Sequence, residues 1–363
     1  MIRDVARDFA QHELKPGVID RDERQLFPAE QIKKLGELGF LGMMVDPGYH
    51  GAGLDTLSYV LVMEELSKID ASTSVIVSVN NSLVCFGLEK YGTAMQKEKY
   101  LKPLAAGKQI GAFCLSEPEA GSDATSLRTT AVDRGDHYLL NGTKNWITNG
   151  STATTYLVIA QTYPDKGHHG INALIVEKGM DGFTLGPKEN KMGIRGSDTH
   201  SLHFNDVIVP KENRIGEDGA GFSFAMKTLE GGRIGIAAQA LGIASGAYEL
   251  SLAYAKQRQT FGKPLAQHQA IQFKLADMAT QIEAARLLCW RAAWLKDQGL
   301  PYAEAASMAK LYASEVAMKT TTEAVQIHGG YGYVKEYHVE RLMRDAKITQ
   351  IYEGTSEIQK LII

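Results

Sequence analysis

The sequence predicts an α+β protein with an N-terminal helical domain, a middle antiparallel β-barrel-like domain and a C-terminal four-helix bundle. Three observations predict this order. Helical hydrophobic periodicity fills roughly the first hundred residues. From Gly107 to about Val209 it gives way to short β-branched runs separated by turn residues. From Gly221 the helical pattern returns in longer segments. We therefore expect domains over 1–108, 109–212 and 213–363.

The first part of the chain predicts four helices, each with apolar residues on one face at a period of about 3.6. They are expected over 1–14, 28–39, 55–69 and 72–91. In the second of them Pro28 opens the helix, Gly39 ends it, and Ile32, Leu35 and Leu38 form the inward stripe. The last is unusually rich in small and β-branched residues.

The middle part predicts short strands joined by tight turns. Strands are expected over Thr125–Val132, His137–Leu140, Tyr156–Ala160 and Ile171–Val176. The turn at 133–136 and the Asn141-Gly142 pair are typical of hairpin connections. Hairpins of this kind predict a compact antiparallel unit.

The last part predicts three long helices and a shorter fourth, which together indicate a bundle. They are expected over Phe222–Gln257, Leu265–Gln298, Pro301–His328 and 338–349. Pro301 suits a first helical position, and Gly329-Gly330 suits a C-terminal cap.

Composition excludes several classes of function. The 39 Lys and Arg residues nearly balance 42 Asp and Glu residues, so the net charge of −3 gives no basis for binding nucleic acid. The three cysteines have neither the spacing of a disulfide framework nor that of a zinc site, which indicates a reducing compartment and no metal. No apolar run is expected to reach the roughly 18 residues of a membrane span. The start of the chain has the pattern of a helix, not of a signal peptide.

The common nucleotide-binding signatures are absent. No G-x-G-x-x-G follows a predicted strand, and no G-x-x-x-x-G-K-[ST] occurs in the chain. Gly51-Ala52-Gly53 lacks a third glycine and lies among helices. A Rossmann or P-loop site is therefore disfavoured, and any nucleotide must be bound in another way.

Two stretches of the middle part suit a ligand but have simpler interpretations. Phe113–Asp123 leaves a strand for a turn whose hydroxyls, amides and glycine suit an anion or the edge of a ring. Taken alone, it is a capped turn. In 144–150 Trp146 lies close to Thr148, and a Trp on a short strand is more often a core residue because its large apolar area favours burial.

Two further motifs end long helices, and for each the sequence leaves two interpretations open. Arg258, in the segment 258–262, either complements the negative end of its helix or binds a phosphate. The glycines of Gln326–Gly332 either cap their helix or let the backbone approach a ligand closely.

The motif Ile351–Gln359 lies near the C-terminus. Ser356 with Gln359 fits a capping box, which predicts the start of a short helix. Glu353 either favours the dipole of that helix or is a carboxylate in an apolar cleft. In a cleft, desolvation would raise its pKa from about 4.3 toward neutrality. Without further context the first interpretation is the simpler one.

Together and in this order the motifs resemble those of the acyl-CoA dehydrogenase family, over essentially the whole chain. The resemblance is carried by Leu115–Pro118 with Gly121–Asp123, Trp146–Asn149, Arg258 with Thr260–Gly262, and Ile351–Gln359. Within the family the chain is most similar to the short-chain (butyryl-CoA) branch. This similarity is carried by Ser78–Leu83, Met192–Ser197 and Gly232–Ala237. Branched short-chain relatives share part of that pattern.

The resemblance implies FAD-dependent dehydrogenation of a short acyl-CoA thioester to trans-2-enoyl-CoA. Glu353 would take the α-proton while the β-hydrogen leaves as hydride to flavin N5. The thioester oxygen would accept hydrogen bonds from the backbone N–H of Glu353 and a ribityl hydroxyl of FAD, because charge develops on it. Some relatives carry the base on a bundle helix at the position of Gly232, which cannot serve here.

The resemblance also implies the remaining contacts. The flavin ring would be contacted by Phe113, Leu115, Ser116, Trp146, Ile147 and Thr148. The FAD of a second chain would be reached by Arg258, Thr260, Phe261, Gln269, Gln326 and Gly330. The phosphate and adenosine end of FAD would be contacted by Thr355 and Glu357. The CoA part, the thioester and the acyl chain would be contacted by Ser122, Glu230, Arg233, Tyr352 and Gly354.

Partners and alternatives follow from the same resemblance. We expect electron-transferring flavoprotein as the acceptor and a homotetramer built as a dimer of dimers, with FAD at the dimer interface. The expected location is the cytoplasm, or the mitochondrial matrix if a leader has been removed. A branched short-chain substrate, an acyl-CoA oxidase and a non-catalytic relative remain alternatives.

Overall fold

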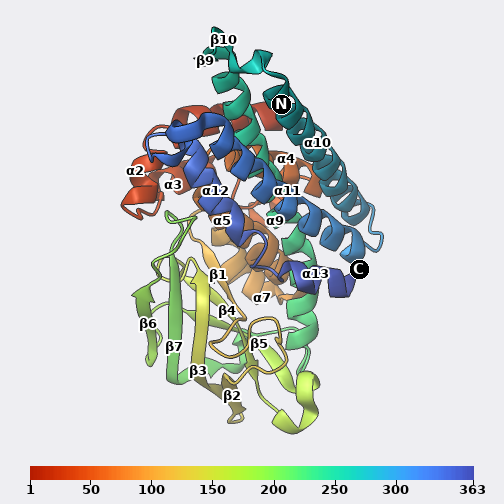
Figure 1. Ribbon diagram of the computed structural model, residues 1–363. Coiled ribbons are helices and arrows are strands. Elements are labelled where there is room, and N and C mark those ends of the chain that lie inside the picture. The colour runs from red at the N-terminus through yellow and green to blue at the C-terminus, as the bar shows by residue number, and fades with distance from the viewer.

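The protein consists of a β domain at one end and helices at the other (Figure 1). The computed structural model describes residues 1–363. One large hydrophobic core joins the N-terminal helices to the C-terminal bundle and extends to the near face of the sheet. A smaller core lies inside the β domain and includes Tyr138, Tyr156 and Phe204. The two helical parts are therefore packed as one body.

The N-terminal helices agree with the predicted pattern and add three short helices that it missed. Their bounds are α1 Ile2–Phe9, α2 Val18–Glu23, α3 Ala29–Glu37, α4 Thr56–Ser67, α5 Ala71–Ser78, α6 Phe86–Tyr91, α7 Ala94–Gln96 and α8 Lys102–Ala105. The short helices α2, α7 and α8 were not predicted. Leu38 was expected on the buried stripe of α3 but is 45% exposed, whereas Ile32 and Leu35 are buried. It lies after the last helical residue, where the 3.6 period no longer holds.

Helices α5 and α6 form one continuous segment through a π-helical stretch, η3 (Val79–Cys85). By length and composition the segment 71–91 is apolar enough to cross a membrane, so the expectation that no run reaches that length was wrong. However, 94% of its most apolar window is buried inside the protein. Burial on all sides is typical of a helix in the core of a large domain.

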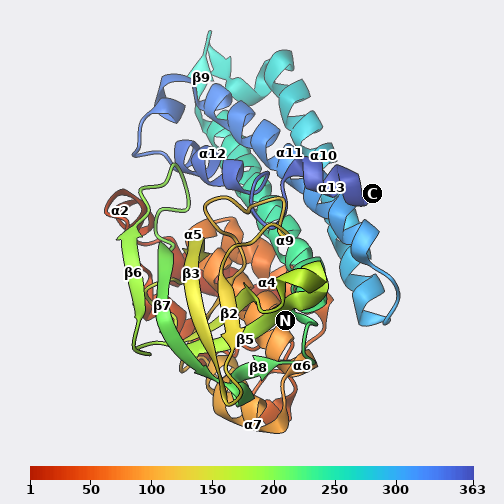
Figure 2. The ribbon, with the colours of Figure 1, turned by 90° about the horizontal axis from the view of Figure 1, so that it is seen from below.

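The sheet is ordered β6-β7-β3-β2-β4-β5-β8, and β1 also pairs with β4. Figure 2 shows β6, β7, β3 and β2 side by side. The bounds are β1 Gly111–Cys114, β2 Thr130–Asp133, β3 His137–Thr148, β4 Thr155–Gln161, β5 Ile171–Glu177, β6 Phe183–Lys188, β7 Thr199–Pro210 and β8 Arg214–Ile215. Most pairings are antiparallel as predicted, but β1 and β2 pair with β4 in parallel.

Two local predictions in the sheet were wrong. Residues 125–129 are not part of a strand, and β2 begins only at Thr130. Asn141-Gly142 does not end a strand. Instead β3 continues through it with a shift of register against β7. Gly142 has φ +143, and a Cβ there would lie 2.6 Å from the Oγ1 of Thr129, so only glycine fits this bulge.

The C-terminal bundle has the predicted helices with shifted ends. Their bounds are α9 Gly221–Gln257, α10 Gln269–Asp297, α11 Ala303–His328, α12 His338–Ile348 and α13 Ser356–Ile362. At 37 residues α9 spans about 55 Å, and it packs on α4 and α11 and also on strands β4 and β5. It therefore links the bundle to the β domain, where the candidate site lies. A small hairpin, β9 (Gln259–Thr260) with β10 (Lys263–Pro264), projects at the far end of the bundle (Figure 1).

Candidate active site

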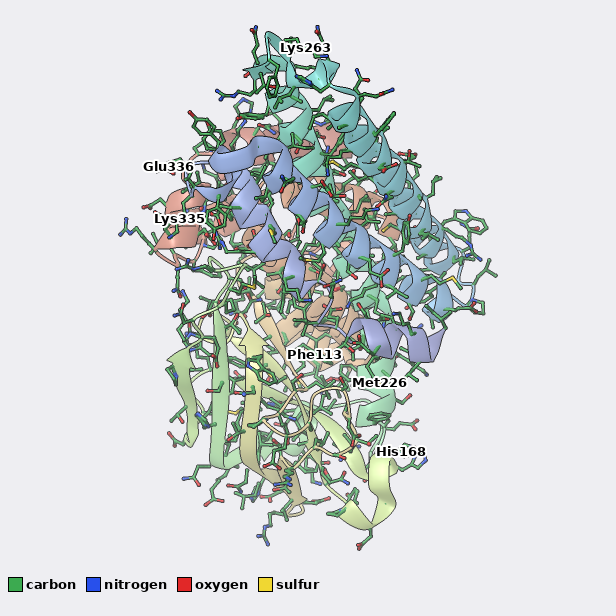
Figure 3. All side chains as sticks on the ribbon, in the orientation of Figure 1. Phe113, His168, Met226, Lys263, Lys335 and Glu336 are labelled. Carbon is green, nitrogen blue, oxygen red and sulfur yellow. The ribbon has the colours of Figure 1, made fainter.

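A cavity of about 200 Å³ lies where the β domain meets the helices. Its lining comes from α5, η3, β1, β3, α9 and the segment that leads into α13. Phe113 of β1 and Met226 of α9 both line it and lie at this junction (Figure 3). Segments far apart in the sequence thus meet at one mostly apolar site.

More than half of the residues implicated by the sequence line this cavity. They are Phe113, Leu115, Ser116, Ser122, Trp146, Ile147, Thr148, Arg233, Tyr352, Glu353 and Gly354. The set includes Glu353, the residues expected at the flavin ring and most of those expected at the substrate. Their convergence supports treating the cavity as the candidate active site.

Glu353 is the most unusual ionisable group of the cavity. Its Oε2 atom is buried and accepts no hydrogen bond from the chain. Burial raises the pKa of this carboxyl to about 7, against the opposing charges of Lys310 and Arg233. A carboxylate with a pKa near neutrality and a free oxygen is suited to accept a proton from a ligand.

The space for this carboxylate exists because residue 232 is glycine. A Cβ at Gly232 would lie 2.0 Å from Oε2 of Glu353 and 2.8 Å from a methyl group of Leu83. In this chain the lack of a side chain at Gly232 leaves room for Glu353.

The backbone at Glu353 has a left-handed conformation. Glu353 has φ +51 and Gly354 has φ +89, which is costly for a glutamate and natural for a glycine. Helix α13 begins immediately afterwards, but the predicted capping box was wrong. Thr355, not Ser356, is the N-cap, and its hydroxyl accepts a hydrogen bond from the N–H of Ile358 at 3.3 Å.

Trp146 was interpreted as a core residue when taken alone, and that interpretation was wrong. Its side chain is 57% exposed, and its φ of +56 lies within a second register shift of β3, between Lys144 and Ile147. The shift turns the indole out of the sheet. An exposed indole beside the hydroxyls of Ser116 and Thr148 fits a flat aromatic ring with a polar edge, such as the isoalloxazine of FAD.

A buried ion pair, which the sequence did not predict, supports the side of the cavity formed by Ser116, Trp146 and Thr148. Lys144 and Glu117 are both buried, with 2.7 Å between Nζ and Oε1. The same ammonium donates to the carbonyl of Leu115 at 2.9 Å. Glu117 also accepts hydrogen bonds from the N–H groups of Arg128 and Thr129. The pair therefore ties the loop after β1 to β3. Nothing in the local sequence pattern distinguishes either residue from a loop charge.

The structure places the other predicted residues outside the cavity. Arg258, Thr260 and Gly330 line a second cavity of about 510 Å³ at the far end of the bundle. Phe261 is 97% exposed at the tip of the β9–β10 hairpin. Gln269 and Gln326 are exposed, Thr355 and Glu357 lie at the start of α13, and Glu230 is half-buried on α9. None of these residues lines the candidate site in one chain, although Thr355 directly follows Gly354 and Glu230 directly follows Leu229, both of which do.

The sequence also missed most of the apolar lining. The lining residues to which it assigned no contact are Val75, Val79, Leu83, Gly121, Ala124, Met226, Leu229 and Ile358. Val75, Val79 and Leu83 recur every four residues in a helical segment, so they share one face. That spacing is the signal that could have found them, although it does not distinguish a ligand cavity from a protein core.

Comparisons with known proteins show which family the chain belongs to. Three family models match in order along the chain: the N-terminal domain of acyl-CoA dehydrogenase over 1–108, its middle domain over 112–207 and its C-terminal domain over 219–363. The short-chain specific acyl-CoA dehydrogenase of Clostridium acetobutylicum is 53% identical over 363 residues, which is all of this chain and 96% of that protein.

Two solved structures are similar over nearly their whole length. Butyryl-CoA dehydrogenase from Megasphaera elsdenii has a TM-score of 0.98 and 52% identity, covering 99% of this chain and 95% of that one. A chain from a structure of the electron transferring flavoprotein of Acidaminococcus fermentans has a TM-score of 0.99 and 53% identity, covering 100% and 95%. Because three family models match in order and full-length relatives are more than half identical, the chain belongs to the acyl-CoA dehydrogenase family and is an FAD-dependent oxidoreductase.

Proposed function

We propose that this enzyme dehydrogenates short straight-chain acyl-CoA thioesters of the butyryl-CoA type, with Glu353 as the base that removes the α-proton. FAD, held at the wall of Ser116, Trp146 and Thr148, would supply the acceptor for the β-hydrogen and its electron pair. The product is then the trans-2-enoyl-CoA. The observation that carries the proposal is the buried, unpaired Oε2 of Glu353, on a carboxyl whose pKa is raised to about 7.

The chain supplies more than the base in this proposal. The N–H of Glu353 donates to no acceptor within the chain, so it is available to a substrate carbonyl. A donor beside the base stabilises the oxygen on which charge develops as the α-proton leaves. Arg233 is 6% exposed, lines the cavity and has an Nε without a partner, which suits contact with a polar part of the substrate.

A short acyl chain is the favoured substrate on two grounds. The cavity lining is mainly aliphatic, with Val75, Val79 and Leu83 contributed by the long core helix. The relative from Clostridium acetobutylicum is named as short-chain specific, and the structural neighbour from Megasphaera elsdenii as a butyryl-CoA dehydrogenase.

Assembly and partners are proposed from the positions of the remaining predicted residues and from the comparisons. The distance of Arg258 and Thr260 from the candidate site supports FAD binding across a dimer interface within a tetramer. The neighbour from a structure of electron transferring flavoprotein supports that protein class as the acceptor. Three free, buried cysteines suit a reducing compartment, either cytoplasm or mitochondrial matrix. We retain domain boundaries at 1–108, 109–212 and 213–363.

The proposal can be tested by following the colour of the bound flavin. Purified enzyme should be yellow and should bleach when butyryl-CoA is added without oxygen. Glu353→Gln should keep the flavin but bleach roughly 10²–10⁴-fold more slowly, because the amide cannot accept the proton. Glu315→Gln, at an exposed carboxylate on α11, is the matched control and should behave as the parent.

Other outcomes would redirect the proposal. Unchanged bleaching by Glu353→Gln would remove Glu353 from the role of base. Specificity constants that favour C8 or α-methyl thioesters over C4 would reject the straight short-chain substrate. Peroxide formation at the rate of turnover with electron-transferring flavoprotein would make the enzyme an oxidase.

A further inference from the structure

The loop that carries Glu353 is held by two buried side chains from two different helices. Glu353 and Gly354 both have positive φ, and such a conformation persists only where its surroundings fix it. Their two carbonyl groups point to α11 and α13, where Lys310 and Gln359 donate to them. The position of the carboxylate therefore depends on these donors.

Lys310 is the first of the two. Its side chain is fully buried on α11, and its Nζ donates to the carbonyl of Gly354 at 2.6 Å. It forms no salt bridge with any carboxylate of the chain. A buried ammonium without an ion pair is costly, and burial lowers the pKa of Lys310 to about 8. Packing alone does not explain a charged lysine at this buried position, so an interaction that uses its charge is expected.

Gln359 is the second. It is also fully buried, and its Nε2 donates to the carbonyl of Gly354 at 2.8 Å and to that of Glu353 at 3.2 Å. A Cβ at Gly354 would lie 2.7 Å from this nitrogen. The close approach of the amide and the left-handed backbone both require glycine there. Gln359 therefore holds the Glu353–Gly354 loop in position but adds no charge beside it.

The charges around Glu353 distinguish the two donors. Arg233 of α9 and Lys310 of α11 face it and both lower its pKa, with Lys310 the stronger. The neutral phenols of Tyr59 (α4) and Tyr352 also lie close enough to interact with it. Glu357 of α13 acts on Lys310 rather than on Glu353 directly. Lys310 is thus the main positive charge opposing the desolvation of the carboxylate.

We propose that Lys310 and Gln359 clamp the Glu353–Gly354 loop, and that the charge of Lys310, held at the carbonyl of the residue next to Glu353, also favours the carboxylate form of Glu353. Both are positioning residues, because they act through the backbone and the field at Glu353. The inference rests on the proposed function, in which Glu353 is the base. By this inference, the charge of the buried Lys310 helps to set the pH range in which the enzyme is active.

The two contributions separate in the pH profile of flavin bleaching by butyryl-CoA. Lys310→Met removes both charge and donor. It should slow bleaching at pH 7 by about tenfold or more and should move the rising limb of the profile upward by roughly one pH unit. The sign follows because losing a nearby positive charge raises the pKa of Glu353. Gln359→Met should slow bleaching at every pH and leave the midpoint of the limb unchanged.

Controls keep the inference testable if a variant is damaged. Ser307→Ala changes another buried residue one turn earlier on α11 and should match the parent. If Lys310→Met loses its flavin, Lys310→Gln keeps a donor, removes the charge and should still shift the limb. Loss of flavin from both, with Ser307→Ala intact, would mean that Lys310 serves the fold and would overturn the proposal.

The clamp and the base can fail separately. With Glu353→Gln inactive, an unshifted midpoint in flavin-loaded Lys310→Met would reject the role of the Lys310 charge. A parental bleaching rate for Gln359→Met would reject the clamp. Either result would leave the base in place. Normal bleaching by Glu353→Gln would instead reject the base, and the clamp with it.

Discussion

Gly232 leaves the space that the Glu353 carboxylate occupies, and the neighbouring glycine offers a matched comparison. A methyl group at position 232 would meet Oε2 of Glu353 at 2.0 Å, whereas one at Gly231 would meet nothing closer than 3.5 Å. Gly232→Ala should therefore displace the carboxylate and slow bleaching about 10²-fold, which is the typical cost of a displacement near 1 Å.

Gly231→Ala should bleach at nearly the parent rate. Both variants should fold with flavin bound, because alanine stabilises the interior of a helix relative to glycine. The measurement is anaerobic bleaching with butyryl-CoA after checking flavin content. Equal rates for the two variants would show that the carboxylate has room to move aside.

At the scale of an element, the Lys144–Glu117 pair joins the loop after β1 to strand β3. Lys144→Met leaves Glu117 buried without its partner, and breaking a buried pair in this way costs about 3–5 kcal/mol of unfolding free energy. The melting temperature and the flavin content should both fall, because the Leu115 carbonyl loses its donor.

Two comparisons test whether the loss of unfolding free energy comes from the carboxylate of Glu117 left buried without Lys144. Adding Glu117→Leu to Lys144→Met should recover part of the loss, since both charges are then gone. Lys178→Met, at an exposed lysine that donates to the carbonyl of Ser151, should cost less than about 1 kcal/mol. A parental melting temperature for Lys144→Met alone would contradict the structural role of the pair.

The elements also show where the sequence could and could not predict the structure. Long amphipathic helices such as α9 and α11 were predicted almost to the residue, because their signal is local and repeats over many turns. Asn141-Gly142 has the local chemistry of a turn. Strand β3 continues through it because β7, some 60 residues later in the chain, pairs with it on both sides of the bulge. No local pattern contains that partner.

Among the residues of the candidate site, too, some features could be predicted from the local sequence and others depend on the fold. Glu353 was predictable through its motif, but the raised pKa depends on burial by α5, η3 and α9, which only the fold brings together. Trp146 was misinterpreted from residue type alone, since its exposure follows from a register shift in β3. Lys310 carries no recognisable signal, because it acts on the backbone carbonyl of a residue far along the sequence, whereas Gln359 was assigned to a capping box instead of to the Glu353–Gly354 carbonyls.

At the scale of the whole molecule, exposed apolar side chains on α10 support the proposed association with a second copy of the chain. Phe273, Leu287 and Trp294 of α10 are each more than half exposed, and their spacing in multiples of seven puts them on one face. The exposed Phe261 projects from the hairpin beyond the same helix. A single chain leaves this apolar surface uncovered, which supports the proposed oligomer.

Mixed dimers can decide whether Arg258 serves its own active site or that of a partner. Arg258→Ala alone should lose most of its flavin, and Glu353→Gln alone should keep flavin without bleaching. In a dimer of one chain of each kind, one site has an intact Glu353 from its own chain and an intact Arg258 from the other. If the sites are shared, co-expressing the two variants should restore about a quarter of the parental activity, because random pairing makes about half of the dimers mixed and each mixed dimer has one intact site of two. If Arg258 acts within its own chain, every site in the mixture is defective and no activity returns, which would reject FAD binding across the interface.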